Sequence, residues 1–312
     1  MAILTAKKNN FLLKNTPKGF TLELQPEFVL PKKVYGDLDS VVSRVLTTFK
    51  DESSNVGVLF SGIKGNSKTT TAKTLCIESG LSVIMITEPY TGADFKAFLS
   101  SLKQEVVIFI DEFEKVYHTD ELQQEFLSIL DGLFDKKKLF LFTSNSADIN
   151  SYLRNRPSRI YYHFKYDNLE SNVVDEIIEN ELEDKEFEPD LRAVLQILGS
   201  VSIDVLLKFI AEVNRFSKSP KELIKGMNIE IEQTNFSVIM IVNGERAETT
   251  CKFNPLVREE FFLTYQDEKG RHKWFEGNFN DYTMYTKGAS FVYENTQNKL
   301  VFTPFKPFKF SL

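Results

Sequence analysis

The sequence predicts an α/β fold: a P-loop parallel sheet with helices on both faces, a C-terminal helical lid and an appended all-β domain. The first observation behind this prediction is that wholly apolar segments such as Val106–Ile110 alternate with amphipathic stretches between Val56 and Phe164. Strands that are apolar on both sides must be covered on both faces, which is typical of parallel sheets. The second and third observations are a change to helical periodicity over 167–226 and a return to short alternating segments over 227–312.

The α/β domain is expected over residues 34–166. Its apolar runs predict strands at Val56–Phe60, Leu81–Ile86, Val106–Ile110, Leu139–Phe142 and Ile160–Phe164. Helical periodicity between them predicts helices at Ser67–Glu78, Thr91–Leu102 and Asp120–Phe134.

The helical lid is expected over 167–226, and the all-β domain over 227–312. Apolar residues at helical spacing predict lid helices at Glu170–Glu183, Pro189–Leu198 and Ile203–Phe216, with a last helix from Pro220 to Gly226. The all-β domain is predicted to have strands at Ile229–Ile231, Ser237–Val242, Glu248–Phe253, Glu260–Tyr265, Lys273–Phe275, Ser290–Tyr293 and Lys299–Phe302. Trp274 and Phe275 are expected in its core. Its phenylalanine-rich end (Phe302, Phe305, Phe308, Phe310) is expected to pack along the same domain or to dock a partner, and Pro304 and Pro307 argue against a central strand there.

Composition excludes several classes of protein. The chain has 312 residues, an ordinary apolar content and a net charge of −6, so it is not expected to be disordered. Two cysteines and three isolated histidines form neither a disulfide framework nor a zinc site. No apolar run is long enough for a membrane span and no signal peptide is evident, which favours a soluble, reduced, cytoplasmic protein.

Positive charge is concentrated at the N-terminus. Residues 1–33 carry six lysines against two glutamates, and we expect them to form a solvated, flexible arm. Residues 165–227, by contrast, carry eight basic and fourteen acidic side chains. Outside the arm no basic stripe is present, so binding to nucleic acid is possible but not favoured.

A phosphate-binding loop is predicted between the first strand and the first helix. The segment from Gly62 to Thr69 fits the pattern G-x-x-x-x-G-K-[ST] except that Ser67 replaces the glycine before the lysine. In such a loop, backbone N–H groups and a helix N-terminus point at phosphates, Lys68 contacts the β/γ oxygens, and the hydroxyl of Thr69 binds Mg²⁺. A Gly/Ser-rich turn before a helix is the alternative.

Two carboxylates follow the third strand. Asp111 and Glu112 stand directly after Val106–Ile110, 43 residues beyond Lys68. The C-terminal edge of a parallel sheet is where ligands bind, so Asp111 is expected to hold Mg²⁺ and Glu112 to orient and polarise the attacking water. A helix N-cap followed by a first-turn acid is the alternative.

Further polar residues follow the fourth strand. Asn145 is placed to reach the γ-phosphate and the lytic water, although a turn residue is the alternative. Arg154, Arg156 and Arg159 are three of the nine arginines and lie within six residues. Because arginine offers a rigid, permanently charged fork for phosphate, this cluster is predicted to reach the ATP of a neighbouring subunit rather than to form a surface salt-bridge cluster.

Taken in order, these motifs resemble an AAA+ ATPase over residues 34–225: Walker A, Walker B, sensor 1, arginine fingers and a lid. The stretch from Arg156 to Ile160 looks like the R-P-G-R-F element of the AAA clade, so the resemblance implies that Arg156 and Arg159 are fingers and that Arg154 is not. It implies a catalytic set of Glu112, Asn145, Arg156 and Arg159, and Mg²⁺ ligands Thr69 and Asp111. For ATP it implies contacts from Tyr35, Gly36, Gly62, Ile63, Lys64, Gly65, Asn66, Ser67, Lys68, Thr69 and Thr70.

Three positions depart from the family pattern or match it only partly. Ser67 is expected to weaken nucleotide binding, and the lid has no clear sensor 2 arginine, with Lys208 as its nearest cation. Tyr90-Thr91-Gly92 follows the second strand, where these ATPases carry an aromatic pore loop, so Tyr90 is a candidate for gripping a polypeptide. An ordinary turn is the alternative at Tyr90.

The leading hypothesis is therefore a Mg–ATP-hydrolysing AAA+ ATPase that acts as a ring of five to seven subunits, with a hexamer favoured. It would remodel or thread a protein substrate, with the all-β domain as adaptor. Alternatives are a nucleic-acid motor, similar to clamp or helicase loaders, and a nucleotide-gated assembly scaffold with slow hydrolysis. Such a compact chain would suit a phage or a small bacterial operon.

Overall fold

The computed structural model divides into two compact units, residues 1–167 and 168–312, and each is described by itself. The described residues are 8–130, 132, 134–145, 157–167, 169–198, 201–229, 235–242, 244–253, 258–267, 269–287 and 290–304. Within them, no helix is both long and apolar enough to cross a membrane.

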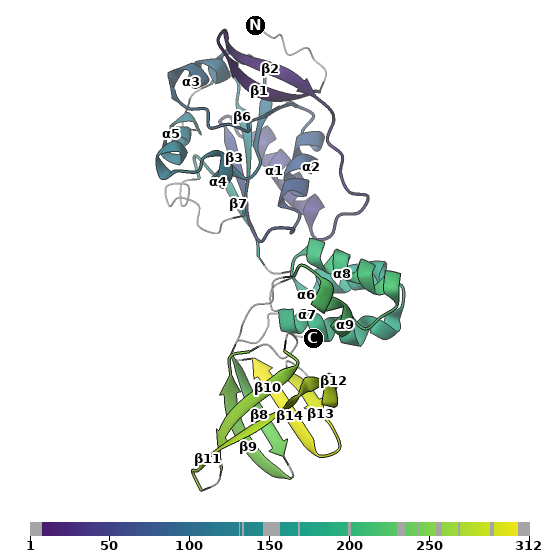
Figure 1. Ribbon diagram of the computed structural model, residues 1–312. Helices are drawn as coiled ribbons and strands as arrows, with labels where there is room; N and C mark the ends of the chain where they lie inside the picture. Colours follow the sequence, from purple (N-terminus) through teal and green to yellow (C-terminus); the bar gives the residue numbers. More distant parts are fainter. Residues whose placement is uncertain are drawn as a thin grey trace. The chain divides into compact units, whose positions relative to one another are not determined.

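The first unit is built on a seven-stranded sheet in the order β2-β1-β4-β5-β6-β3-β7 (Figure 1). All neighbouring strands are parallel except β1 and β2, which form an antiparallel hairpin. The strands are β1 Asn10–Thr16, β2 Gly19–Gln25, β3 Val56–Gly62, β4 Ser82–Met85, β5 Val106–Ile110, β6 Lys138–Ser144 and β7 Tyr162–Tyr166. The central strands β3, β5 and β6 are buried along their whole length, as their continuous apolar runs predict.

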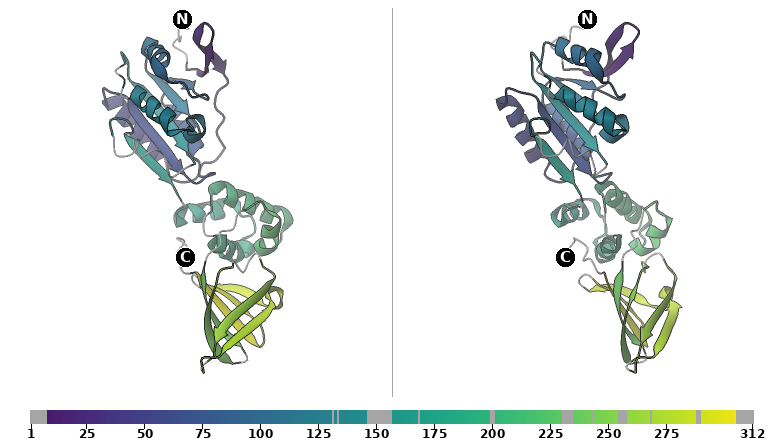
Figure 2. Two further views of the ribbon diagram at one scale, coloured as in Figure 1. Left: turned by 60° about the vertical axis from the view of Figure 1, so that its left-hand side comes forward. Right: turned by 90° about the vertical axis from the view of Figure 1, so that its left-hand side faces the viewer.

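Helices cover both faces of this sheet, as two views turned about the vertical axis show (Figure 2). Helices α1 (Leu38–Asp51) and α2 (Lys68–Glu78) pack on one face over the side chains of Val58, Phe60 and Leu141. Helices α3 (Gly92–Ser101), α4 (Phe113–Val116) and α5 (Asp120–Leu130) pack on the other. The predicted fold class, a helix-covered P-loop sheet followed by an all-β region, is confirmed.

The N-terminal segment corrects the expectation of a flexible arm. Residues 10–25 form the β1–β2 hairpin, and β1 pairs in parallel with β4 to extend the sheet. The side chain of Leu13 is fully buried, and the ring of Phe20 packs against Phe95 of α3 with centroids 5.6 Å apart. Burial of these apolar side chains stabilises the packed hairpin, and the surrounding lysines do not oppose it because their ammonium groups stay in water.

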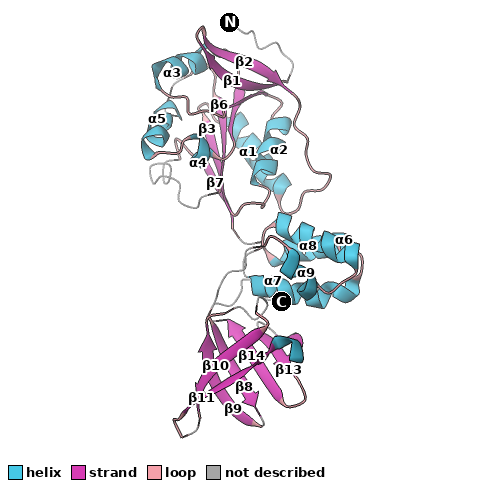
Figure 3. Ribbon diagram, viewed as in Figure 1, coloured by secondary structure: helices cyan, strands magenta, loops and turns pink. Residues whose placement is uncertain are grey.

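The second unit begins with helices and ends in strands (Figure 3). Its helices are α6 Ser171–Glu181, α7 Glu188–Leu198, α8 Ile203–Phe216 and α9 Pro220–Leu223. Ser202 begins α8 by accepting a hydrogen bond from the backbone N–H of Val205, which satisfies one of the free donors at the helix start.

The strands of this unit form a five-stranded antiparallel sheet, β12-β13-β14-β8-β9, and a two-stranded ribbon, β10–β11. Their bounds are β8 Phe236–Val242, β9 Glu245–Cys251, β10 Glu260–Gln266, β11 His272–Asn278, β12 Thr283–Lys287, β13 Ser290–Glu294 and β14 Asn298–Pro304. Buried aromatic rings, among them Phe236, Phe279 and Phe302, form the core. We use the name β-module for residues 235–304.

Two expectations for the β-module need correction. Pro304 was expected to argue against a central strand, yet β14 lies between β13 and β8 and continues to Pro304. The proline is tolerated there because the last position of a strand loses little hydrogen bonding when its N–H is missing. Trp274 is 66% exposed rather than buried, because the alternation of β11 turns it outward. The segment after Pro304 lies outside the described residues, and so does the expected strand Ile229–Ile231 apart from its first residue.

Candidate functional site

The loop between β3 and α2 has an unusual backbone. Gly62, Gly65 and Ser67 have φ angles of 131°, 87° and 62°, in the left-handed region that favours glycine. At Gly62 any side chain is excluded, because a Cβ atom would lie 2.1 Å from the carbonyl oxygen of Tyr166. That oxygen accepts a hydrogen bond from the N–H of Ile63 at 2.8 Å, which holds the loop against the end of β7.

Lys68 begins α2 and turns back into the loop. Its side chain is 5% exposed, and Nζ donates to the carbonyl oxygens of Gly62 and Ile63 at 2.9 and 2.7 Å. Burial lowers the pKa of Lys68, and the nearby carboxylates of Glu114, Asp111 and Glu112 partly oppose this effect. The loop therefore encloses a cation at the helix N-terminus, a combination that suits an anionic ligand.

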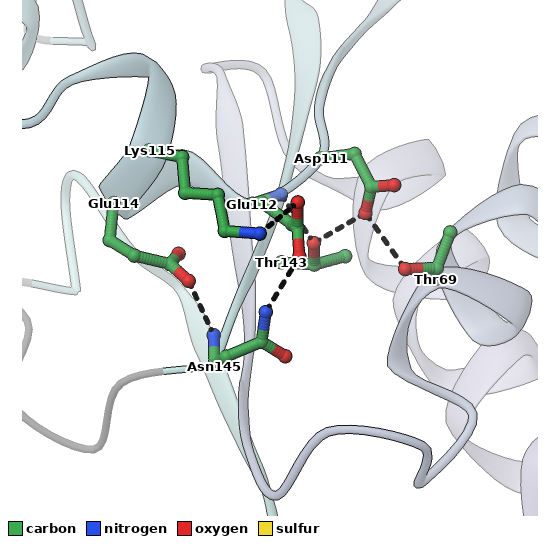
Figure 4. A network of polar contacts seen from close by, with 7 residues as sticks. All are labelled: Thr69, Asp111, Glu112, Glu114, Lys115, Thr143 and Asn145. Carbon is green, nitrogen blue, oxygen red and sulfur yellow. Dashed lines mark hydrogen bonds and ion pairs between the residues drawn. The ribbon is translucent and has the colours of Figure 1, made fainter. Parts of the chain in front are cut away.

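Asp111 is connected to two hydroxyl groups. Its Oδ1 accepts hydrogen bonds from Oγ1 of Thr69 at 2.8 Å and from Oγ1 of Thr143 at 2.6 Å (Figure 4). Thr69 lies in the first turn of α2, Asp111 follows β5, and Thr143 lies near the end of β6. The C-terminal ends of parallel strands meet at one edge of a sheet, and the order β5-β6-β3 brings these groups together there.

Glu112 is the second carboxylate at this edge. Its φ of 52° is left-handed, and its N–H donates to Oγ1 of Thr143 at 2.9 Å. Its Oε1 accepts from Nδ2 of Asn145 at 2.9 Å, and its Oε2 pairs with Nζ of Lys115 at 2.7 Å (Figure 4). The hydrogen bond from Lys115 is the main cause that lowers the pKa of Glu112, with a smaller effect from Asn145, so Glu112 is held ionised.

Glu114 supports Asn145 from the other side. Its Oε1 accepts from the backbone N–H of Asn145 at 2.9 Å, while its Oε2 is buried without a hydrogen-bond partner among the described residues. Asn145 therefore has both its backbone and its side chain fixed by carboxylates. This arrangement orients the amide toward Glu112.

The structure thus brings together Lys68, Thr69, Asp111, Glu112 and Asn145, which were predicted from separate motifs. Of the other predicted contacts, Lys64 lowers the pKa of Glu112 through its charge, after Lys115 and Asn145. Asn66 is 3% exposed and donates to the backbone oxygen of Asp167 at 2.5 Å. Predicted residues Ile63, Gly65, Ser67 and Thr70 lie in the same loop or the first turn of α2.

The predicted adenine-contacting segment lies before α1. Tyr35 is 5% exposed, and Nζ of Lys33 lies 4.8 Å from the centroid of its ring. Gly36 has a φ of 89°, and its carbonyl accepts from the N–H of Leu38 at 2.9 Å, which turns the chain into the helix. Contact of Tyr35 and Gly36 with adenine remains a proposal.

The position of Tyr90 is not that of a pore loop. Its ring is 8% exposed and packs edge-on against Phe20, with centroids 5.1 Å apart. Its hydroxyl donates to the backbone oxygen of Leu13 at 3.3 Å and to Oε2 of Glu88 at 3.1 Å. The β1–β2 hairpin covers this tyrosine, so the expectation that it grips a polypeptide is wrong for the structure described.

Of the predicted arginines, the structure describes only Arg159. Arg154 and Arg156 lie outside the described residues. Arg159 lies at the opposite end of β3, where its carbonyl oxygen would be 2.0 Å from a Cβ atom on Gly57. Five residues separate Gly57 from Gly62, which at strand spacing is roughly 16 Å, so the Arg159 side chain cannot reach the loop of its own chain.

Three contributors were missed from the sequence: Thr143, Glu114 and Lys115. Thr143 directly follows the predicted strand Leu139–Phe142, two residues before Asn145, and this position at the end of the strand was the available signal. Lys115 follows Glu112 by three residues, a spacing at which side chains meet on a helix. Glu114 gave no signal of its own.

Comparisons with known proteins identify a family for part of the chain. Residues 58–167 match the family model described as "ATPase family associated with various cellular activities (AAA)". No curated protein sequence matches the chain.

Solved structures similar to the chain include RuvB from Thermotoga maritima, described as a Holliday junction branch migration motor. That structure has 19% identity and a TM-score of 0.43, covering 65% of this chain and 68% of RuvB. A single-residue variant of the same RuvB has 18% identity and a TM-score of 0.44, covering 64% and 66% of the two chains. The chain therefore spans about two thirds of the length of the RuvB structures that it matches.

The family match begins in β3 and ends just after β7, so it contains the loop, both carboxylates and Asn145. The resemblance to AAA+ ATPases inferred from the motifs is thereby confirmed for this part of the chain. Residues 58–167 therefore carry the AAA domain that this family model describes.

Proposed function

We propose that the chain hydrolyses Mg²⁺–ATP at the edge of the sheet where β3, β5 and β6 end. The observation that carries this proposal is the hydrogen-bonded set of Thr69, Asp111, Thr143, Glu112 and Asn145 beside the buried ammonium of Lys68. A helix N-terminus with a cation supports phosphate binding, and two carboxylates in different surroundings support two different roles.

The phosphate and metal roles follow from donor chemistry. Lys68 now donates to two carbonyl groups and would exchange these for β/γ-phosphate oxygens. The hydroxyl of Thr69 and the carboxylate of Asp111, with oxygens 2.8 Å apart, are the hard oxygen donors that Mg²⁺ prefers. When bound, the ion would neutralise charge on the phosphates.

Glu112 is the group proposed to orient the attacking water. Its lowered pKa keeps it ionised, so it can accept a hydrogen bond from water. Each of its oxygens accepts one hydrogen bond, from Asn145 or from Lys115, and each keeps a second lone pair that can accept a hydrogen bond from water. Asn145 would then contact the γ-phosphate or hold the same water.

We further propose that the active form is a ring, as the resemblance implies, with a hexamer favoured within the range of five to seven subunits. The distance between Arg159 and the loop of its own chain supports this proposal. An arginine at the far end of β3 can contribute to hydrolysis only in the site of a neighbouring subunit, where such a group is worth ~10³–10⁵ in rate.

Mixing two inactive variants tests this arrangement. Lys68→Ala should remove ATP binding, and Arg159→Ala should remove the trans contribution, so each alone should lose most ATPase activity. In a mixed ring, an intact Lys68 site beside an intact Arg159 should recover a measurable fraction of the wild-type rate. Arg215→Ala, an exposed arginine on α8, is the control and should remain active. Absence of recovery, with particle mass confirming mixed rings, would refute action in trans.

A nucleotide-gated scaffold with slow hydrolysis is a second candidate. Two observations favour it: the left-handed Ser67 in the loop and the ion pair that holds Glu112 to Lys115. Release of ADP and phosphate more slowly than subunit exchange would support the scaffold. Multiple turnovers within the lifetime of one assembly would support the ATPase motor.

The expectation that the chain remodels a protein substrate rested in part on Tyr90 as a pore-loop aromatic, and the burial of Tyr90 weakens that argument. Tyr90 is covered by the β1–β2 hairpin. The β-module, proposed as an adaptor, is therefore the part of the chain in which a substrate site has to be sought.

A further inference from the structure

Glu114 is a third carboxylate beside Asp111 and Glu112, and its two oxygens have different surroundings (Figure 4). Oε1 accepts a hydrogen bond from the backbone N–H of Asn145 at 2.9 Å. Oε2 is buried and has no hydrogen-bond partner among the residues that the structure describes. This position calls for an explanation, because a buried carboxylate oxygen normally has a partner.

The packing of α4 fixes where Glu114 lies. The ring of Phe113, the first residue of this helix, is 1% exposed and stacks on the ring of Tyr117 with centroids 5.0 Å apart. It also meets the ring of Phe142 on β6 edge-on, with centroids 5.3 Å apart. Because Phe113 is locked in the core, the next residue of the turn, Glu114, is held beside Asn145. The bond between Glu114 and Asn145 thus joins α4 to the end of β6.

This bond restricts the orientation of Asn145. Asn145 directly follows β6, so its backbone lies beyond the strand. Its N–H donates to Glu114, and its side-chain Nδ2 donates to Oε1 of Glu112 at 2.9 Å. A residue held at both its backbone and its amide can take few orientations. Glu114 therefore fixes the residue proposed to contact the γ-phosphate or the attacking water, and it needs no contact with either.

The described contacts of Glu114 add little to the stability of the fold. A hydrogen bond to a charged acceptor is stabilising, but a charged oxygen that is buried and unpaired has a cost of similar size. Because the two effects nearly cancel, removal of the carboxylate should change the melting midpoint little. A buried charge that contributes so little stability is typical of a functional position.

Glu114 also acts on Lys68 through its charge. Burial lowers the pKa of Lys68, and three carboxylates oppose this effect; the influence of Glu114 is larger than those of Asp111 and Glu112. Replacing Glu114 by a neutral residue therefore alters the surroundings of the lysine as well as those of Asn145. A decisive experiment has to separate these two effects.

We propose that Glu114 is a positioning residue for hydrolysis, which holds the backbone of Asn145 so that the Asn145 amide stays oriented toward Glu112 and the attacking water. This inference rests on the proposed ATPase function and adds a residue to its machinery. Because Glu114 acts on the reaction through Asn145, its loss should lower kcat far more than it weakens ATP binding.

Two replacements of Glu114 separate the hydrogen bond from the charge. Glu114→Gln loses the charge but keeps an oxygen that can accept from the N–H of Asn145, whereas Glu114→Ala loses both. Glu114→Ala should lower kcat about 10- to 100-fold, as misplacement of a group at the reacting atoms does, and Glu114→Gln should keep most of the wild-type rate. Any effect of the lost charge on Lys68 should be equal in the two variants. Glu125→Ala removes an exposed acid on α5 and is the control, which should keep the wild-type rate.

Further measurements distinguish positioning from a structural role. The dissociation constant of a fluorescent ATP analogue should change less than about threefold in Glu114→Ala. The melting midpoint of this variant should stay within about 3 °C of the wild type, because the lost bond and the relieved burial nearly cancel. When Glu114→Ala is combined with Asn145→Ala, kcat should fall no further than in Asn145→Ala alone, because the two residues act as one unit.

Three results would refute the inference. The first is hydrolysis by Glu114→Ala at the wild-type rate. The second is a melting midpoint lowered by more than about 10 °C in Glu114→Ala and not restored in Glu114→Gln, which would assign a structural role. The third is a double variant in which the losses of Glu114→Ala and Asn145→Ala multiply, because Glu114 would then act independently of Asn145. A wild-type chain without ATPase activity would refute the proposed function, and this inference with it, whereas each of the three results would leave the proposed function standing.

Discussion

Thr143 connects the two carboxylates of the AAA site, and replacing it with valine should damage both stability and turnover. Its side chain is 1% exposed; Oγ1 donates to Asp111 and accepts from the N–H of Glu112. Valine keeps the shape but removes both bonds. Loss of a hydrogen bond to a charged group costs about 1.5–3 kcal/mol, and a neutral one about 1 kcal/mol. The free energy of unfolding of the first unit should therefore fall by about 2–4 kcal/mol.

Calorimetry of the full-length chain can measure this change. For a unit of this size, each kcal/mol lowers the melting midpoint by about 2–4 °C, so the transition of the first unit should fall by about 5–15 °C. ATP turnover (kcat/KM) should fall about 10- to 100-fold if Asp111 binds Mg²⁺ as proposed, because loss of a hydrogen-bond partner of a metal ligand typically has an effect of this size. Thr143→Ser keeps the hydroxyl and should stay within about 1 kcal/mol of the wild type. Equal behaviour of the valine and serine variants would refute the role assigned to Thr143.

Variants at three further positions test other parts of the structure. Burial lowers the pKa of Lys138 to about 8, so between pH 8 and 10.5 the unfolded chain binds more protons there. Over this pH range the free energy of unfolding of the wild type should therefore rise by about 3 kcal/mol relative to that of Lys138→Met. Calorimetry in which the two proteins show parallel pH dependence would contradict this. The backbone of Ser67 is left-handed, so Ser67→Gly should be tolerated, whereas Ser67→Val should lower the free energy of unfolding by about 1–3 kcal/mol and weaken ATP binding. Equal melting midpoints of the two variants would exclude strain at this position. Tyr90→Ala should destabilise the first unit by about 3–5 kcal/mol through the loss of a buried ring, and a fully stable variant would mean that Tyr90 is not held under the hairpin.

Much of the AAA domain was predictable from the sequence. Strands such as Val106–Ile110 are buried on both faces, and their apolar runs have no other stable environment in a domain of this size. The residues that hold a ligand at such a sheet must follow the ends of strands. The spacing of Lys68, Asp111 and Asn145 along the sequence therefore predicted most of the geometry of the candidate site.

What was missed depends on contacts between distant parts of the chain. The β1–β2 hairpin pairs with β4 because Leu13 and Phe20 find an apolar surface on α3, which no local pattern reveals. The same packing covers Tyr90. Trp274 was expected in the core because large rings usually are, but the register of β11 places it on the outer face.

Hydrolysis by the Glu112→Gln variant tests the central claim most directly. In the presence of Mg²⁺ and ATP, the wild-type chain should release phosphate over many turnovers, whereas Glu112→Gln should bind ATP with similar affinity and release almost none. Glutamine keeps the hydrogen bond with Asn145 but loses the charge that would polarise water. Bound nucleotide recovered from this variant should be ATP rather than ADP. Turnover by Glu112→Gln at the wild-type rate would contradict the assignment of this edge of the sheet as the hydrolytic site.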